Sequence, residues 1–92
     1  MDYGARRFDD QGVPNLNSRR QDPALVALGR TLRAIRLEQG ISQEKLALLA
    51  EVDRSYVGRV ERGDNNVALL TLAALSQALG LKISAVLIRA GL

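Results

Sequence analysis

Glycines at the ends of helix-like segments constrain the fold of this chain more than any other feature. Gly40, Gly63, Gly80 and Gly91 each follow a stretch in which apolar residues recur at three- and four-residue steps. Glycine is favoured just after a helix because it accepts the left-handed backbone conformation found there. One more short helix is expected to end near Ala50. These signals predict an all-α fold of five short helices with tight connections and no strand.

Polar residues stand at the expected starts of the first three helices. Asp22, which is followed by a proline, can cap the first helix, Ser42 the second and Asp53 the third. A fourth helix is expected from about residue 68 to 79 and a fifth from about 83 to 90. The fourth begins at an alanine and therefore lacks a good cap.

The first 21 residues lack this periodicity. They combine glycine, proline, asparagine and serine with four arginines and three aspartates, a composition that favours a flexible, disordered N-terminal tail. The alternative is a basic arm in which Arg19 and Arg20 reach DNA beside the folded part. We therefore expect a tail over residues 1–21 and a single folded domain over residues 22–92.

Composition excludes most classes of enzyme. The chain contains no cysteine and no histidine, which removes disulfides, thiolate and imidazole metal ligands, and the commonest nucleophiles and general bases. No clustered carboxylate pair in the folded part replaces them, so we expect no enzyme, no metal and no cofactor. The net charge of +3 suits a polyanionic partner without requiring one. No apolar stretch is long enough to span a bilayer, and the N-terminus differs from a secretory signal, so a cytoplasmic location is expected.

Residues 43–62 carry the spacing of two helices that cross over a short turn. Counted from residue 43, the fourth, eighth, tenth, fifteenth and eighteenth places are apolar and hold Leu46, Ala50, Val52, Val57 and Val60. The fifth place is small and holds Ala47. A small side chain is needed where the helix axes approach. With the flanking segments LEQGISQ and ERGD, this stretch resembles the lambda repressor and Cro (XRE-type) helix-turn-helix family. The resemblance covers about residues 25–90 and implies a five-helix, lambda-repressor-like DNA-binding domain.

The resemblance also implies two architectural features. Many members have glycine at the turn place that Glu51 holds here, and the positive φ implied there costs a non-glycine residue roughly 1 to 2 kcal/mol. Arg36 and Glu61 match places that form a buried or half-buried ion pair between the first helix and the end of the third. That pair would serve architecture and not base reading.

A DNA-binding site on the second and third helices is implied as well. Gln43 would bind a phosphate at the start of the second helix, although an ordinary first-turn glutamine is the alternative. Arg54, Ser55 and Arg59 match the places that usually touch base edges, and the arginines have the fork geometry that suits guanine. The alternative for these side chains is a solvated helix face.

Four more residues are candidates for DNA contact. Tyr56 either packs against the second helix or offers its hydroxyl to phosphate and its ring to a thymine methyl. Arg62, Asn65 and Asn66 follow the third helix and are either phosphate contacts or ordinary polar loop residues.

The last two helices carry more apolar side chains than one small core can hide. Relatives with five helices commonly dimerise through this end, so the resemblance implies a homodimer with an interface made by Leu69, Ile83, Val86, Leu87, Ile88 and Leu92. A twofold dimer places two recognition helices one DNA turn apart, roughly 34 to 36 Å, and selects a pseudo-palindromic site. A monomer with exposed apolar residues is the alternative.

These features predict a sequence-specific DNA-binding transcriptional regulator of the repressor or controller type, which binds a pseudo-palindromic operator as a dimer. Its expected partners are double-stranded DNA and a second copy of the chain. The alternative is a protein-interaction module, such as an antitoxin, whose main partner is a toxin or a transcription component. Neither hypothesis involves a membrane.

Overall fold

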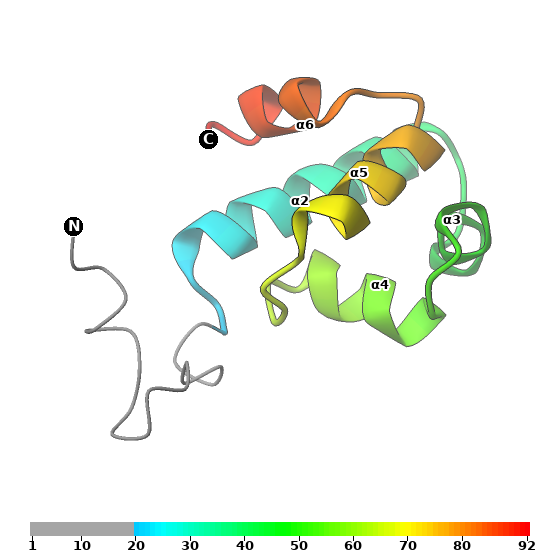
Figure 1. Cartoon of the computed structure of the whole chain (residues 1–92), viewed down its shortest axis with the longest axis horizontal. Coiled ribbons are helices and arrows are strands. Elements are labelled where there is room, and N and C mark those ends of the chain that lie inside the picture. The colour runs from blue at the N-terminus through cyan, green and yellow to red at the C-terminus, as the bar shows by residue number, and fades with distance from the viewer. Residues whose placement is uncertain (1–19) are drawn as a thin grey trace.

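The computed structural model describes residues 20–92, which form five α-helices and contain no strand (Figure 1). The helices are α2 (Pro23–Glu38), α3 (Gln43–Ala50), α4 (Arg54–Glu61), α5 (Leu69–Ala78) and α6 (Ile83–Arg89). The predicted all-α, five-helix fold is confirmed. The predicted flexibility of the tail concerns residues 1–19, which lie outside the described residues. Arg20 and Gln21, also assigned to that tail, instead lie against the folded part. Gln21 hydrogen-bonds to the loop after α4, and the Arg20 guanidinium lies 3.9 Å from the Asp64 carboxylate of that loop.

The predicted helix starts are confirmed, although not every cap forms a hydrogen bond. The Asp22 carboxylate accepts a hydrogen bond from the backbone N–H of Ala24 at 2.9 Å, which closes the start of α2. The Ser42 hydroxyl accepts one from the N–H of Lys45 at 3.0 Å at the start of α3. Within residues 20–92, Asp53 stands at the cap position of α4 but makes no side-chain cap hydrogen bond there, and Ala68, at the cap position of α5, has no side chain that could make one.

Left-handed residues end the helices as predicted. Gly40, Gly63, Gly80 and Gly91 have φ between 70° and 80°. Glu51, in the turn between α3 and α4, has φ 60° and ψ 43°. The positive φ implied for a non-glycine residue at this turn is therefore confirmed.

The core lies where α2 meets the other helices, and its largest members are aliphatic. Among its most deeply buried side chains are Leu32, Ile35, Leu46, Val57 and Leu75. The helices α2 and α4 approach so closely that only glycine fits at position 29. A Cβ atom there would lie 2.3 Å from the carbonyl oxygen of Val60 and 2.6 Å from that of Glu61.

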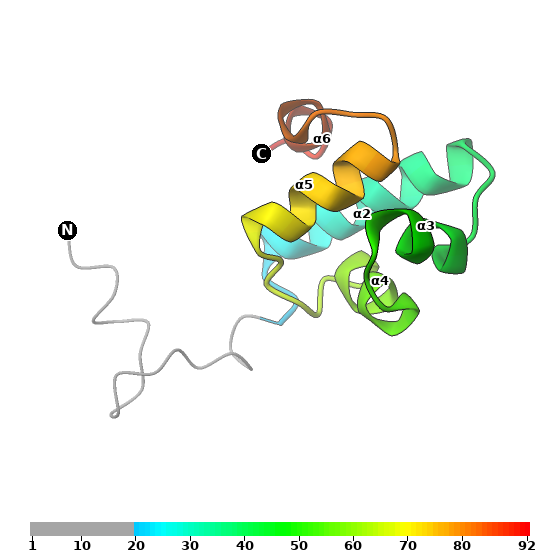
Figure 2. The same ribbon diagram turned by 45° about the vertical axis from the view of Figure 1, so that its right-hand side comes forward.

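The α6 helix covers α2 and α5, and one of its predicted interface residues belongs to this core (Figure 2). Val86 is completely buried, so its assignment to a dimer interface is wrong. A seven-residue amphipathic helix must direct one stripe into its own core, and Ile83 and Leu87 flank Val86 on that stripe, partly buried. Leu69, Ile88 and Leu92 remain 67%, 77% and 57% exposed.

Within residues 20–92, no single helix has the length and apolar character needed to cross a membrane. Taken together, α5 and α6 have that length and apolar character, but the chain bends by 90° between them.

Candidate nucleic-acid interface

The α3 and α4 helices form a helix-turn-helix unit with α4 at the edge of the molecule. Val57 and Val60 of α4 are buried against the core, whereas Arg54, Ser55 and Arg59 are exposed. In both views α6 lies across the molecule from α4 (Figures 1 and 2). The exposed side of α4 is thus free of the other helices, and we call α4 the recognition helix.

Tyr56 and Arg59 lie together on this helix. The guanidinium carbon of Arg59 is 5.7 Å from the centre of the Tyr56 ring, within the range of a cation–π contact. The ring itself is half-buried and packs against the core. Tyr56 therefore lies between the core and the Arg59 guanidinium. Contact of its hydroxyl with DNA stays a prediction.

The predicted ion pair between Arg36 and Glu61 forms and is buried. Arg36 Nε donates to Glu61 Oε2 at 2.7 Å, and Arg36 Nη2 donates to Glu61 Oε1 at 3.0 Å. The third nitrogen, Arg36 Nη1, donates to the carbonyl of Ile41 at 3.0 Å. The hydrogen bond with Glu61 raises the pKa of the Arg36 guanidinium above its ordinary value. The pair joins the end of α2 to the end of the recognition helix.

Gln43 belongs to the same network. Its side-chain amide donates to Glu61 Oε1 at 3.0 Å, which uses one of its two N–H groups inside the protein. The first backbone N–H groups of a helix have no partner within the helix, and phosphate binding by Gln43 and the start of α3 stays a prediction. Sequence reasoning missed the link to Glu61, because the two residues are 18 positions apart and no local spacing reports such a contact.

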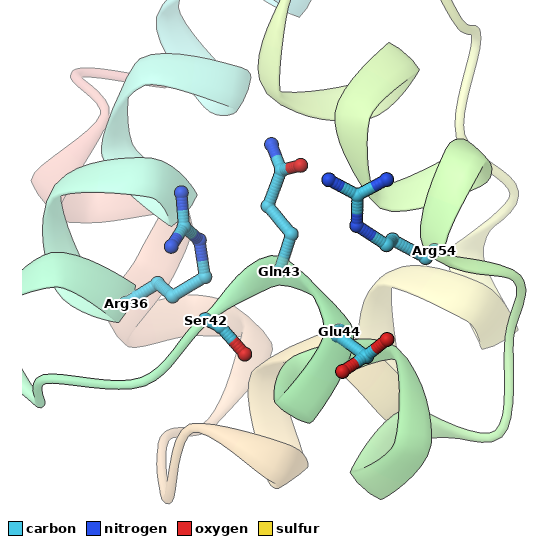
Figure 3. Close-up of a pocket in the computed structure, with 5 residues that line it drawn as sticks. All are labelled: Arg36, Ser42, Gln43, Glu44 and Arg54. Atoms are coloured by element: carbon cyan, nitrogen blue, oxygen red, sulfur yellow. The ribbon is translucent and has the colours of Figure 1, made fainter.

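A hollow of about 460 Å³ opens beside Gln43 and is lined by Arg36, Ser42, Gln43, Glu44 and Arg54. Figure 3 shows the Gln43 side chain standing between the two arginines, with its amide oxygen toward the Arg54 guanidinium. Arg54 is exposed and belongs to the recognition helix. The structure therefore brings the expected phosphate contact and an expected base contact to one site.

The loop after α4 carries the remaining candidates. Arg62 is exposed, and its Nε donates to the carboxylate of Asp64 at 3.2 Å. Asn65 is half-buried and Asn66 is exposed. Gln21, from before α2, reaches this loop and donates to the Asp64 carboxylate at 2.5 Å. Sequence reasoning missed Gln21 and Asp64, which lie 43 positions apart.

Comparison with known proteins places this arrangement in a family. A family model described as "Helix-turn-helix" matches residues 32–86, which include all of α3 and α4. The chain belongs to the helix-turn-helix family. The resemblance read from residues 43–62 is thereby confirmed.

Members of the family with known roles are similar to this chain. The immunity repressor protein of Bacillus phage phi105 is 39% identical over 61 residues, covering 66% of this chain, and the chain spans only 42% of that repressor. The restriction-modification controller protein C.AhdI from Aeromonas hydrophila, whose crystal structure is known, is 47% identical in sequence to this chain. The two structures superpose with a TM-score of 0.66, and the match covers 67% of this chain and 94% of that protein.

A third relative has been crystallised on DNA. The restriction-modification controller protein C.Esp1396I, as a tetramer in complex with its natural 35 base-pair operator, is 27% identical with a TM-score of 0.69. The match covers 76% of this chain and 96% of that protein. The shared fold is therefore one that helix-turn-helix regulators use.

Proposed function

We propose that the protein is a sequence-specific DNA-binding transcriptional regulator of the repressor or controller type. The observation that carries this proposal is the exposed face of α4, where Arg54, Ser55 and Arg59 project from a helix-turn-helix unit. The major groove of DNA admits an α-helix, and arginine forks pair with the O6 and N7 atoms of guanine. In this proposal Arg54, Ser55 and Arg59 read bases.

The residues around the recognition helix hold the DNA backbone. Gln43 and the start of α3 bind one phosphate beside Arg54, while Arg62 and Asn66 after α4 contact another. Backbone contacts of this kind set the register of a recognition helix without carrying sequence information. Glu44 also lines the hollow beside Gln43, and its negative charge limits phosphate binding at that site. Asn65, which is half-buried, contributes less.

We further propose that the chain acts as a homodimer joined through α5 and α6. Leu69 at the start of α5, Ile88 on α6 and Leu92 after α6 are exposed, and large exposed apolar side chains are candidates for burial in an interface. Because α6 lies across the molecule from α4, such a dimer leaves both recognition helices free. C.Esp1396I forms a tetramer on its operator, which supports assembly of this chain into oligomers. A pseudo-palindromic operator with half-sites roughly 34 to 36 Å apart follows from the twofold symmetry.

A specific observation supports the second candidate function, a module whose main partner is another protein. Leu48 on α3 and Leu70 on α5 are 70% and 83% exposed, and neither is one of the three interface residues named above or lies on α4. A toxin or a transcription component that bound these side chains would bury them.

Selection of bound sequences from a random DNA pool tests the two functions. The regulator predicts a single enriched motif with two symmetric halves. Arg54→Ala combined with Arg59→Ala should abolish enrichment, whereas Arg30→Ala combined with Arg33→Ala removes equal charge from exposed positions of α2 and should retain the motif. A pool without enrichment would overturn the regulator and favour the protein-binding module.

A further inference from the structure

Gln21, two residues before α2, is hydrogen-bonded to the loop that follows the recognition helix. The backbone N–H of Gln21 donates to the carbonyl of Gly63 at 2.8 Å. Its side-chain amide donates to the carbonyl of Arg62 at 2.8 Å and to the Asp64 carboxylate at 2.5 Å. These bonds hold Gln21 at φ 63°, a left-handed conformation that is unfavourable for a residue with a Cβ atom.

This attachment gathers two exposed arginines around one carboxylate. Arg20 and Arg62 approach Asp64 to 3.9 Å and 3.2 Å, and their side chains are 60% and 62% exposed against 16% for Asp64. The hydrogen bonds from Gln21 and then from Arg62 lower the pKa of the Asp64 carboxyl below its ordinary value. Among the described residues the cluster therefore keeps one positive charge in excess.

The ion pairs of this cluster leave both guanidinium groups able to bind another anion. Exposed pairs of this kind contribute little stability, because water competes with each partner and the long side chains lose freedom. The 3.9 Å separation between Arg20 and Asp64 is longer than a charge-assisted hydrogen bond, which is about 2.7 to 2.9 Å. Arg20 can turn toward a stronger anion without breaking the attachment that Gln21 makes.

The cluster also lies where DNA would pass. In both views the lead into α2 runs beside the loop after α4, on the side of the molecule that carries α4 (Figures 1 and 2). A helix in the major groove is bordered by the two sugar-phosphate strands. The loop that follows such a helix therefore lies next to the sugar-phosphate backbone of the DNA, at the edge of the half-site.

We propose that Gln21 is a positioning residue that holds Arg20 against the DNA backbone beside the half-site. Arg20 thereby adds a phosphate contact that lies outside the helix-turn-helix unit. The inference rests on the proposed function, because it requires that α4 enter the major groove. It also assigns a role to one of the two arginines of the basic-arm alternative, while Arg19 lies outside the described residues.

Salt titrations of the full chain test this role. Binding is measured on a duplex that carries the selected site and on a random duplex, at several salt concentrations. Arg20→Ala should weaken binding to both duplexes by the same factor. It should make the slope of log affinity against log salt less steep by about 0.9 per subunit, so the affinity lost between 50 and 200 mM salt becomes about threefold smaller for each subunit and about tenfold smaller for the dimer. Arg20→Lys should keep the slope.

Gln21→Ala separates positioning from charge. It removes no charge, yet it should also make the slope less steep, and it should have no further effect when Arg20→Ala is present, because the two residues act as one unit. The matched control is Arg30→Ala, which removes one positive charge from an exposed position of α2 and should leave the slope unchanged. A thermal melt of each variant reports folding separately.

Two results would overturn the inference. One is an unchanged slope in Arg20→Ala, and the other is an effect of Gln21→Ala that is equally large with and without Arg20. If the parent chain selects a DNA site and either result is obtained, the inference alone fails. If the parent chain selects no site, the proposed function fails first, and the inference fails with it.

Discussion

Arg36, near the end of α2, binds both carboxylate oxygens of Glu61, the last residue of α4, through hydrogen bonds of 2.7 and 3.0 Å. The same carboxylate accepts a hydrogen bond from Gln43 at the start of α3. One buried carboxylate therefore connects three helices and sets how the recognition helix lies against the rest of the domain. Arg36 and Glu61 are buried, whereas Gln43 also lines the open hollow beside Arg54, so the network joins the helix-turn-helix unit to α2.

Arg36→Ala should lower the free energy of unfolding by about 3 kcal/mol, because it leaves the Glu61 carboxylate buried without its partner. The DNA sequence preference of the folded fraction should stay unchanged. Thermal or denaturant unfolding of Arg36→Ala, Glu61→Ala and the double variant measures the coupling. The double variant should lose less than the sum of the single losses. Additive losses would show that the two side chains do not stabilise each other.

Gly29→Ala should destabilise the domain by about 3 kcal/mol or more, because a Cβ atom 2.3 Å from a backbone oxygen forces α2 away from α4. Gly58→Ala is the matched control within α4. Its Cβ would meet side-chain atoms alone, the flexible end of Arg62 at 3.1 Å and the Gln43 amide at 3.8 Å, so its better helix propensity should stabilise the fold by about 0.5 to 1 kcal/mol. Denaturant melts compare the two. Equal losses would mean that helix separation does not decide the effect.

Glu51→Gly should stabilise the domain by about 1 kcal/mol, because Glu51 has φ 60° and glycine accepts this conformation without strain. The greater freedom of glycine in the unfolded chain offsets part of the gain. Glu51→Ala tests the side chain alone and should leave the melting temperature nearly unchanged. A lower melting temperature in both variants would show instead that the carboxylate itself stabilises the turn.

Arg59→Ala should weaken binding to the preferred site by about 1 to 3 kcal/mol per half-site and relax the preference at one base pair. Arg62→Ala should weaken binding to all sequences alike and reduce the salt slope by about one per subunit. Isotherms on the preferred site, on single-base variants and on random DNA distinguish the two outcomes. An equal loss on every sequence for Arg59→Ala would make this residue a phosphate contact.

The chain should form a dimer in solution with about twice its mass of 10.0 kDa. Ile88→Asp should shift light scattering at micromolar concentration to the monomer mass, because it would bury an unpaired charge in the interface. Leu48→Asp changes a similarly exposed residue on α3 and should leave the dimer intact. A parent chain that remains monomeric at millimolar concentration would contradict the dimer and the argument for a palindromic site.

Local signals explain why much of the fold could be predicted. Asp22 and Ser42 cap helices through residues two and three positions away, and Gly40 and Gly63 end helices by their own φ. Such features depend on a few neighbouring residues, so they are visible in the sequence. The spacing within residues 43–62 likewise identified the helix-turn-helix unit that the family comparison confirms. The Arg36–Glu61 pair was expected from the resemblance alone, since no local pattern links residues 25 positions apart.

The sequence by itself determined the number of helices within residues 20–92, their approximate bounds and the polar side of α4, because these follow from periodicity and capping. Only the tertiary structure decided which apolar side chains meet. It buries Val86 inside the monomer, although its spacing was compatible with an interface. It brings Gln21 to Asp64 and Gln43 to Glu61. The physical reason is that periodicity sets the phase of a helix about its own axis. The neighbours that each face meets depend on how the helices cross and how closely they approach, as at Gly29.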